Sequence, residues 1–242
     1  MKIIIAKTAE EFDAKAAAIV ARQIIDKPDS VLGFATGNTT LGLHKKLAEM
    51  TQALSLDWSA IRTVNLDEFL GAAHENPLGV YWRMWDQLLK YTNVKPENVH
   101  VPDSDPEKGQ ETCEAFPKML REMGCVDLQV LGIGTNAHIG MNDPGHPWGA
   151  DMLVVPISPS LIAAKAHLWG GADRMPKEGI TMGMRLILQG RHQLLMARGA
   201  DKAEAIAAAL QGPGTQEVPA SCLQLHPNVT VLLDEAAAAL LK

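Results

Sequence analysis

The stretch Val31–Thr40 reads VLGFATGNTT, so that an apolar strand, a small polar turn and the start of a helix follow one another directly. Such a turn exposes backbone N–H groups at the positive end of a helix, where proteins commonly hold phosphate. The stretch lacks the spacing of glycine and lysine found in a nucleotide P-loop or a dinucleotide-binding turn. An ordinary strand-to-helix turn capped by Thr39 or Thr40 is the structural alternative.

The same succession of strand and helix recurs along the whole chain. Short runs rich in Val, Ile and Leu alternate with longer segments of helical period, a pattern typical of α/β proteins. Several runs are apolar throughout, which indicates strands buried on both faces. The sequence therefore predicts a doubly wound, mostly parallel, Rossmann-like sheet flanked by helices, in a single domain spanning residues 1–242. The expected strands are Lys2–Ala6, Val31–Ala35, Ile61–Leu66, Leu128–Gly132, Met152–Val155, Gln193–Ala197 and Val229–Leu233, and the expected helices are Ala9–Ile25, Leu41–Met50, Val80–Leu89, Pro106–Met123, Ile180–Gln189, Lys202–Leu210 and Glu235–Leu241.

Composition and charge exclude several classes of protein. The 242 residues are 47% hydrophobic and 21% charged, which excludes a disordered, collagen-like or coiled-coil chain. A net charge of -6 argues against general binding to nucleic acid or to an anionic membrane. No stretch approaches the ~20 apolar residues of a membrane span. Three cysteines without a C-x-x-C pair indicate neither a disulfide framework nor a thiolate zinc site, and we expect a cytoplasmic protein.

One candidate catalytic residue follows the third expected strand. In open parallel sheets, ligands bind beyond the carboxyl ends of the strands, and Ile61–Leu66 ends directly on Asp67 and Glu68. Burial at such a strand tip raises the pKa of a carboxyl group toward that of a useful general base. The structural alternative is capping or turn formation by Asp67, with Glu68 as its structural partner.

The richest candidate segment is Leu131–Gly145, which reads LGIGTNAHIGMNDPG. His138 and Asp143 lie five residues apart in a stretch without a strong helix signal. A histidine near a carboxylate beyond a buried strand is an acid–base arrangement, because histidine titrates near neutral pH. A histidine that merely satisfies its hydrogen bonds within the loop is the structural alternative.

A lysine follows the strand Gln193–Ala197. Lys202 falls at the start of an expected helix, where a cation opposes the helix dipole unless it meets an anion. This position favours a phosphate ligand, and a solvated surface lysine is the alternative.

Taken together, these segments resemble the glucosamine-6-phosphate deaminase (glucosamine/galactosamine-6-phosphate isomerase) family, whose wider fold group includes 6-phosphogluconolactonases and ribose-5-phosphate isomerases. Four motifs carry the resemblance: Leu32–Thr39 is similar to the phosphate loop G-L-A-T-G-[GS]-T, Val64–Phe69 to [FV]-N-[ML]-D-E-[YF], Leu131–Gly145 to L-G-[IV]-G-x-[ND]-G-H-I-[AG]-F-N-E-P-G, and Ala220–Pro227 to A-S-x-L-Q-L-H-P. The resemblance implies conversion of an amino-sugar phosphate and water to a ketose phosphate and ammonia, without a metal or organic cofactor.

The resemblance also implies roles for individual residues. Asp67 takes the place of the base that moves a proton between C2 and C1, and His138 that of the histidine that opens the sugar ring. Asp143 takes the place of the carboxylate that supports the histidine, and Asn136 that of an acidic or amide residue two positions before it. The implied substrate contacts are Gly37, Asn38, Thr39 and Lys202 for the phosphate, and the backbone of Ile133 and Gly134 for the sugar.

This chain departs from the family pattern near the third motif. Ala137 replaces the glycine before the histidine, and Asp143 replaces the usual Glu. Family members usually carry a phosphate-holding arginine about two dozen residues later, whereas residues 143–171 contain none. His167 falls near the expected place, and Arg174 is the nearest guanidinium.

Three other functions compete with deamination of glucosamine 6-phosphate. The first is the same reaction on galactosamine 6-phosphate, and the second is lactone hydrolysis of the 6-phosphogluconolactonase kind. Lactonases typically have Asp-Glu-Arg after the second strand, whereas this chain has Asp67-Glu68-Phe69. The third is a non-catalytic sugar-phosphate sensor. We expect a small-molecule sugar phosphate as the partner of a monomer or small homo-oligomer.

Overall fold

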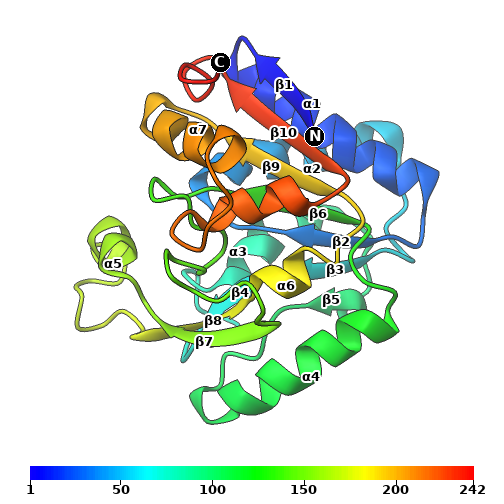
Figure 1. The fold of residues 1–242 in the computed structure, drawn as a ribbon. Helices are drawn as coiled ribbons and strands as arrows, with labels where there is room; N and C mark the ends of the chain where they lie inside the picture. Colours follow the sequence, from blue (N-terminus) through cyan, green and yellow to red (C-terminus); the bar gives the residue numbers. More distant parts are fainter.

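The computed structural model describes residues 1–242, and its centre is a seven-stranded sheet (Figure 1). Every neighbouring pair of strands is parallel, in the order β1-β10-β9-β6-β2-β3-β5. The predicted doubly wound parallel sheet is therefore confirmed. Its strands are β1 (Lys2–Ala6), β2 (Val31–Phe34), β3 (Arg62–Asn65), β5 (Val99–His100), β6 (Leu128–Gly132), β9 (Gln193–Ala197) and β10 (Val229–Asp234).

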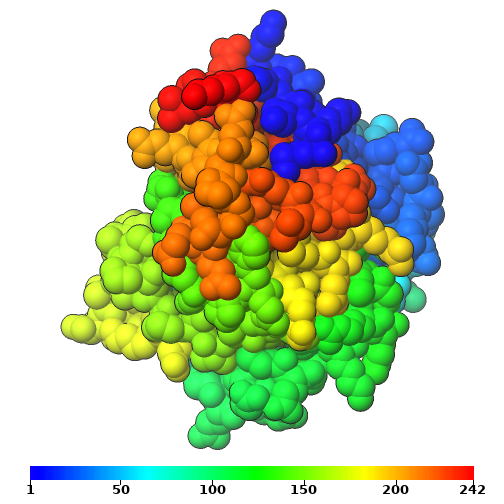
Figure 2. Space-filling model, in the orientation of Figure 1, coloured from blue at the N-terminus to red at the C-terminus, as the bar shows by residue number.

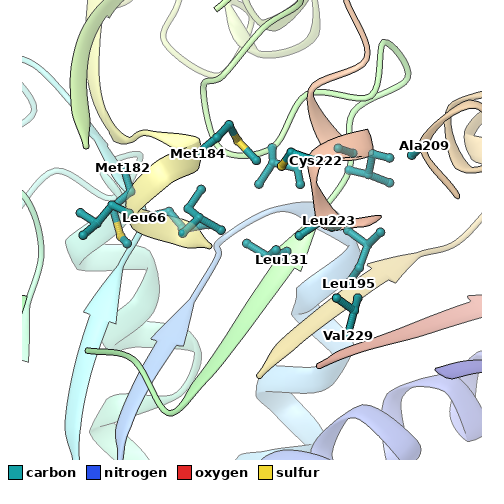
Figure 3. Close-up of a cluster of buried hydrophobic side chains, with 14 of the residues drawn as sticks. Leu66, Leu131, Met182, Met184, Leu195, Ala209, Cys222, Leu223 and Val229 are labelled. Carbon is teal, nitrogen blue, oxygen red and sulfur yellow. The ribbon is translucent and has the colours of Figure 1, made fainter. Parts of the chain in front are cut away.

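Two hydrophobic layers cover the two faces of this sheet. Along β9, Leu194 and Met196 enter one layer while Leu195 and Ala197 enter the other, as the period of two in a strand requires. The first layer packs against α1 (Ala9–Asp26), α2 (Leu41–Leu54) and α3 (Val80–Gln87). The second lies under α4 (Gly109–Glu122), α6 (Met184–Ile187), α7 (Ala203–Gln211) and the 3-10 segment η6 (Pro219–Leu225), and Figure 3 shows its centre.

A second, antiparallel sheet lies beside the first. Its order is β4 (Asp67–Phe69), β8 (Glu178–Met182) and β7 (Met152–Pro156), and a short helix, α5 (Pro159–Lys165), follows β7. The chain passes from β3 to β4 within a few residues, because Leu66 leaves the large sheet and its carbonyl accepts the N–H of Met182 at 2.7 Å. Asp67 is thus the first residue of a strand in the small sheet.

One expected helix is wrong and another is only partly right. Residues 180–189 have helical spacing of apolar side chains, but Ile180–Met182 belong to β8, which pairs on both sides with β4 and β7, and the helix of this segment is limited to α6. Residues 235–240 form successive turns in place of the expected helix Glu235–Leu241, and Asp234 Oδ1 accepts the N–H of Ala237 at 2.8 Å. The other expected elements are present with ends shifted by a few residues, and β4, β5, β8 and α5 were not expected from the sequence.

The carboxyl ends of four adjacent strands gather the candidate residues. β9, β6, β2 and β3 are consecutive neighbours in the sheet, and the phosphate turn, the His138 loop, Lys202 and Asp67 follow them. The space-filling view in Figure 2 shows the N-terminal strand and the C-terminal turns side by side at one end, with α4 at the other. None of the helices is both long and apolar enough for a bilayer-spanning segment.

Candidate active site

The Asp67 carboxyl group lies where the two sheets meet. Asp67 pairs with Thr181 across the small sheet, and its side chain is only partly exposed. Burial raises the pKa of Asp67 to about 6, and the positive charges of Lys165 and Arg83 oppose that rise. The direction agrees with the sequence expectation, because a carboxylate with a pKa near 6 is a stronger base than an ordinary aspartate and is still ionised at neutral pH.

Glu68 supports α3 and makes no hydrogen bond to Asp67. Its Oε1 accepts the N–H groups of Phe69 at 2.8 Å and Val80 at 2.9 Å, and its Oε2 accepts that of Tyr81 at 2.9 Å. Gly79, at the N-terminal end of α3, has no capping side chain of its own. A carboxylate twelve residues upstream of Val80 therefore fixes the start of α3.

His138, Asn136 and Asp143 form a short polar relay. His138 Nδ1 lies 2.6 Å from Asn136 Oδ1, and Asn136 Nδ2 donates to Asp143 Oδ1 at 3.0 Å. The direct separation of His138 Nδ1 from Asp143 Oδ1 is 3.6 Å. Burial lowers the pKa of His138, an effect that Asp143 opposes and Lys202 reinforces. Because the amide oxygen of Asn136 only accepts, a neutral imidazole here carries its proton on Nδ1, and its Nε2 is left as a proton acceptor.

The backbone of the loop that carries His138 runs close to Asp67. A Cβ at Gly134 would overlap the imidazole of His138, so only glycine leaves room for the ring. Gly140 has a φ of 60°, and a Cβ there would lie 3.5 Å from Asp67 Oδ2. Ala137 has a φ of 63°, in the left-handed region that favours the glycine of the family pattern. The His138 loop and Asp67 therefore face one site.

The phosphate turn leaves its helix start without a side-chain cap. Residues Asn38–Thr40 form a 3-10 turn that leads into α2, and neither Gly37 nor Thr40 caps it with a side chain. The expected structural alternative of capping by Thr40 is wrong, because its hydroxyl donates back to the carbonyls of Ala35 at 2.8 Å and Gly37 at 3.0 Å. Gly37 faces open space, and Thr39 is half-buried.

Lys202 lies close to the same site. It ends the 3-10 turn Ala200–Lys202 directly before α7, and its side chain is only 18% exposed. Its ammonium lies 3.4 Å from Asp201 Oδ2, and its charge reaches His138. The turn after β2 packs beside β9, so that the phosphate turn and the segment leading to Lys202 are neighbours. Lys202 is thus not the freely solvated lysine of the alternative interpretation.

An open cleft gives access to the relay. Its volume is about 680 Å³, and it lies between the His138 loop and the segment that joins β7 to α5. Asn136 and Asp143 line one wall, and Ser158, Pro159 and Ser160 line the other. Ile133, expected to border the sugar, is buried beneath the loop, so only its backbone is placed to do so. No three His, Cys, Asp or Glu side chains converge as a metal site would require.

Two cations near Asp67 were missed by sequence reasoning. Arg83 lies on α3 and Lys165 ends α5, and both are half-buried with charges that act on Asp67. Neither residue lies next to one of the four motifs, so no local sequence pattern indicated a role for them. His167 and Arg174, noted from the sequence, are both exposed.

The parallel sheet and its edge residues define a Rossmann-like α/β protein of the sugar-phosphate isomerase and deaminase type. The chain belongs to the family described as glucosamine-6-phosphate isomerases/6-phosphogluconolactonase, which matches residues 4–232. A glucosamine-6-phosphate deaminase of Thermoanaerobacter pseudethanolicus is 40% identical over 241 residues, covering 100% of this chain and 95% of the relative. Glucosamine-6-phosphate deaminase 2 of Bacillus subtilis is 41% identical over 244 residues, covering 100% and 98%.

Solved structures give the same result. A monomeric glucosamine-6-phosphate deaminase superposes with a TM-score of 0.95 at 37% identity, covering 99% of this chain and 100% of that one. A 6-phosphogluconolactonase from Trypanosoma brucei reaches a TM-score of 0.80 at 19% identity, covering 100% of this chain and 98% of that one. The second likeness is one of fold alone. The family expected from the sequence is confirmed.

Proposed function

We propose that this enzyme converts glucosamine 6-phosphate and water to fructose 6-phosphate and ammonia. The observation that carries the proposal is the position of Gly140 in the His138 loop, where an added Cβ would lie 3.5 Å from Asp67 Oδ2, so that the backbone of the loop passes close to Asp67. A group suited to ring opening and a base of raised pKa therefore serve one substrate. The roughly 40% identity to deaminases over the whole chain supports the same reaction.

His138 opens the sugar ring in this proposal. Its Nε2 takes the proton of the anomeric hydroxyl and returns a proton to the ring oxygen as the C1–O5 bond breaks. Asn136 fixes the Nδ1–H tautomer, and Asp143 balances the positive charge that appears on the ring in between.

Asp67 then isomerises the open chain. Its carboxylate removes the C2 proton and returns it to C1, while one proton of the C2 ammonium group passes to the C1 oxygen, which leaves an iminium group at C2. Water adds to that carbon, and ammonia leaves. One base can serve both carbons because C1 and C2 are directly bonded. The substrate must therefore be held so that both carbons lie within reach of the carboxylate.

Binding of the substrate phosphate fixes the position of C1 and C2 relative to Asp67. We assign it to the uncapped turn at Gly37, Asn38 and Thr39, with Lys202 supplying a charge from the neighbouring strand end. Ile133 and Gly134 offer backbone groups to the sugar. We expect the protein to act in the cytoplasm as a monomer or small homo-oligomer.

An ammonia-release assay tests the reaction. Purified protein is given 2-amino-2-deoxyhexose 6-phosphates, including glucosamine 6-phosphate and its C4 epimer galactosamine 6-phosphate, and 6-phosphogluconolactone in a parallel hydrolysis assay. Release of ammonia from glucosamine 6-phosphate supports the proposal, and preference for the epimer redirects it. Hydrolysis of the lactone without ammonia release, or binding without turnover of any sugar, would contradict it.

A further inference from the structure

Two fully buried polar side chains join the His138 loop to the small sheet. Thr181 lies in β8, and Asn142 lies in the loop itself. Neither side chain has a part in the chemical steps assigned to His138 and Asp67. Polar groups are buried in proteins with the hydrogen bonds that they make, so the partners of these two side chains show what they hold.

Thr181 holds the backbone of the loop beside Asp67. It is the residue opposite Asp67 in the pairing of β8 with β4, and its Oγ1 accepts the N–H of Met141 at 3.2 Å. A Cβ at Gly140 would lie 2.8 Å from that oxygen and 3.5 Å from Asp67 Oδ2, so only glycine permits this close approach. The Gly140 backbone therefore lies against both the Thr181 hydroxyl and the Asp67 carboxyl group.

Asn142 links the same loop to the end of β8. Its Nδ2 donates to the carbonyl of Ile139 at 2.9 Å and to that of Met182 at 2.8 Å. Met182 in turn donates its N–H to the carbonyl of Leu66, the residue before Asp67, at 2.7 Å. A continuous path of hydrogen bonds therefore runs from the Asn142 side chain to the backbone next to Asp67.

The stability of the core does not by itself explain an asparagine at position 142. The Oδ1 atom of Asn142 is buried without a hydrogen-bond partner, and an unpaired buried acceptor lowers the stability of a fold. The carbonyl of Ile139 already accepts the backbone N–H of Asn142 at 3.0 Å, so it does not need the side chain as a donor. What the amide adds is the connection between the loop and β8.

This connection determines how well Asp67 is covered. Burial is the largest cause of the raised pKa of Asp67, and the Gly140 backbone passes close to its Oδ2. The charged groups that act on Asp67 or are acted on by it are Lys165 of α5, Arg83 of α3 and Glu68 of β4. None of the three belongs to the His138 loop or to β8. Release of the loop would therefore change the burial of Asp67 rather than the charges around it.

We propose that Thr181 and Asn142 are positioning residues for the proposed reaction. They hold the Gly140 backbone against Asp67, and they thereby fix the His138 loop relative to that carboxyl group. The catalytic consequence rests on the proposed function: ring opening takes place at C1 and proton transfer between C2 and C1, so the imidazole and the carboxylate must keep one separation. The same contacts exclude water from Asp67, which keeps it a stronger base than an exposed aspartate.

The test measures the pKa of Asp67 in the unliganded protein. Aspartate labelled with carbon-13 at Cγ reports each carboxyl group by NMR as the pH is changed, and Asp67→Asn identifies the signal of Asp67. The wild type is compared with Thr181→Val, which removes the hydroxyl, Thr181→Ser, which keeps it, and Asn142→Leu, which removes both donors. Thr63→Val is the matched control, because Thr63 is also a buried strand threonine but its hydroxyl makes no hydrogen bond.

Release of the loop admits water to the carboxyl group. In Thr181→Val and Asn142→Leu the pKa of Asp67 should therefore fall from about 6 toward the value of about 4 that is typical of an exposed aspartate. Thr181→Ser and Thr63→Val should keep the wild-type value.

Three results would overturn the inference. An unchanged or higher pKa in Thr181→Val would show that the loop stays in place without the hydroxyl, and the same result in Asn142→Leu would remove the role of the amide. An equal fall in Thr181→Ser would show that the hydroxyl is not the group that holds the loop. Thermal unfolding followed by circular dichroism shows whether each variant is folded. If Asn142→Leu does not fold, the comparison of Thr181→Val with Thr181→Ser decides the question.

This titration requires neither substrate nor turnover, so its result is separable from that of the ammonia-release assay. Kinetics adds a second readout if the enzyme deaminates glucosamine 6-phosphate. Thr181→Val should then lower kcat at least about tenfold, and the acid limb of kcat/KM should move to lower pH together with the measured pKa. The Kd of 2-amino-2-deoxyglucitol 6-phosphate, an open-chain ligand, should change less than about threefold, because other residues hold the phosphate. Equal losses of kcat and of ligand affinity would contradict a positioning role.

Discussion

Nδ1 of His138 lies 2.6 Å from Oδ1 of Asn136. An amide oxygen only accepts hydrogen bonds, so this contact fixes the imidazole proton on Nδ1. Asn136 in turn donates to Asp143, which makes the amide the link between histidine and carboxylate. The family resemblance implied that Asp143 supports His138, and the structure places His138 Nδ1 and Asp143 Oδ1 3.6 Å apart. The carboxylate therefore acts on His138 through its charge and through Asn136.

Asp67→Asn should abolish deamination while the affinity for a sugar-phosphate ligand stays nearly the same. The amide cannot accept the C2 proton, and loss of a general base typically costs ~10²–10⁴ in rate. Steady-state kinetics together with the Kd of 2-amino-2-deoxyglucitol 6-phosphate checks this. If the variant retained more than about a tenth of wild-type kcat, Asp67 would not be the essential base.

The pKa of Asp67 predicts the acid side of the pH profile. The reaction needs the carboxylate, and burial raises its pKa to about 6, so kcat/KM should fall as the pH drops through about 6. An ordinary exposed aspartate would give a fall near pH 4. A profile measured from pH 4.5 to 8 separates the two, and a flat profile down to pH 5 would contradict the assignment.

The same pKa predicts an effect of pH on stability. The folded protein holds the Asp67 proton more tightly than the unfolded chain, so ionisation of this group lowers the free energy of unfolding as the pH rises from about 4 to about 6. The loss is at most about 3 kcal/mol, and less because the carboxyl is partly exposed. Asp67→Asn removes it, so denaturant titrations should show this variant gaining stability over the wild type at pH 8 but not at pH 4.

The placement of Asp67 could be predicted because its signal is local. An apolar strand that ends on a carboxylate needs only strand direction and burial to put that group at the ligand-binding edge. The small sheet could not be predicted in this way. Residues 180–189 carry apolar side chains at helical spacing, but residues 180–182 complete β8 because β4 and β7 offer partners on both sides, and only the four residues of α6 are helical. A Cβ at Gly183 would also overlap the carbonyl of Ala150, so the chain passes close to Ala150 just where β8 ends.

The cations near Asp67 depend on this non-local architecture. Lys165 reaches the site because α5 follows β7 of the small sheet, and Arg83 does so because Glu68 fixes the start of α3. Neither relationship leaves a pattern of spacing in the sequence. The motifs therefore predicted Asp67, His138 and Lys202, which each follow a strand of the main sheet, and did not mark the two cations whose charges act on Asp67.

Glu68→Ala should destabilise the fold without removing a group that contacts substrate. Three N–H groups lose their acceptor, including two at the start of α3, and the free energy of unfolding should fall by on the order of 3 kcal/mol. Urea denaturation measures the change, with Glu75→Ala, an exposed carboxylate in the same connection, as control. Equal stability of the two variants would show that Glu68 does not hold the helix.

Lys202→Ala should raise KM more than it lowers kcat. A lysine that binds the phosphate equally in the ground state and the transition state contributes uniform binding, so its loss appears in KM. Initial-rate kinetics on glucosamine 6-phosphate, with Lys118→Ala as the exposed-lysine control, measures this. An unchanged KM would mean that Lys202 serves only its neighbours Asp201 and His138.

The relay at His138 makes the most specific prediction. If His138 opens the ring, His138→Gln and Asp143→Asn should both lose kcat on the cyclic sugar, because the first removes the proton acceptor and the second removes the charge that supports it. Substrate binding should stay mostly intact. Asn136 cannot replace the lost charge, since an amide is neutral.

An open-chain substrate analogue separates ring opening from the later steps. It bypasses the step assigned to His138, so the deficit of both variants should shrink on it while that of Asp67→Asn persists. Single-turnover rates on the cyclic and open-chain compounds provide the comparison, with Asp67→Asn as the internal reference. Equal losses on both compounds would mean that the His138 relay serves the proton transfers at C1 and C2 or holds the loop in place. Ring opening would then have to be assigned to another group.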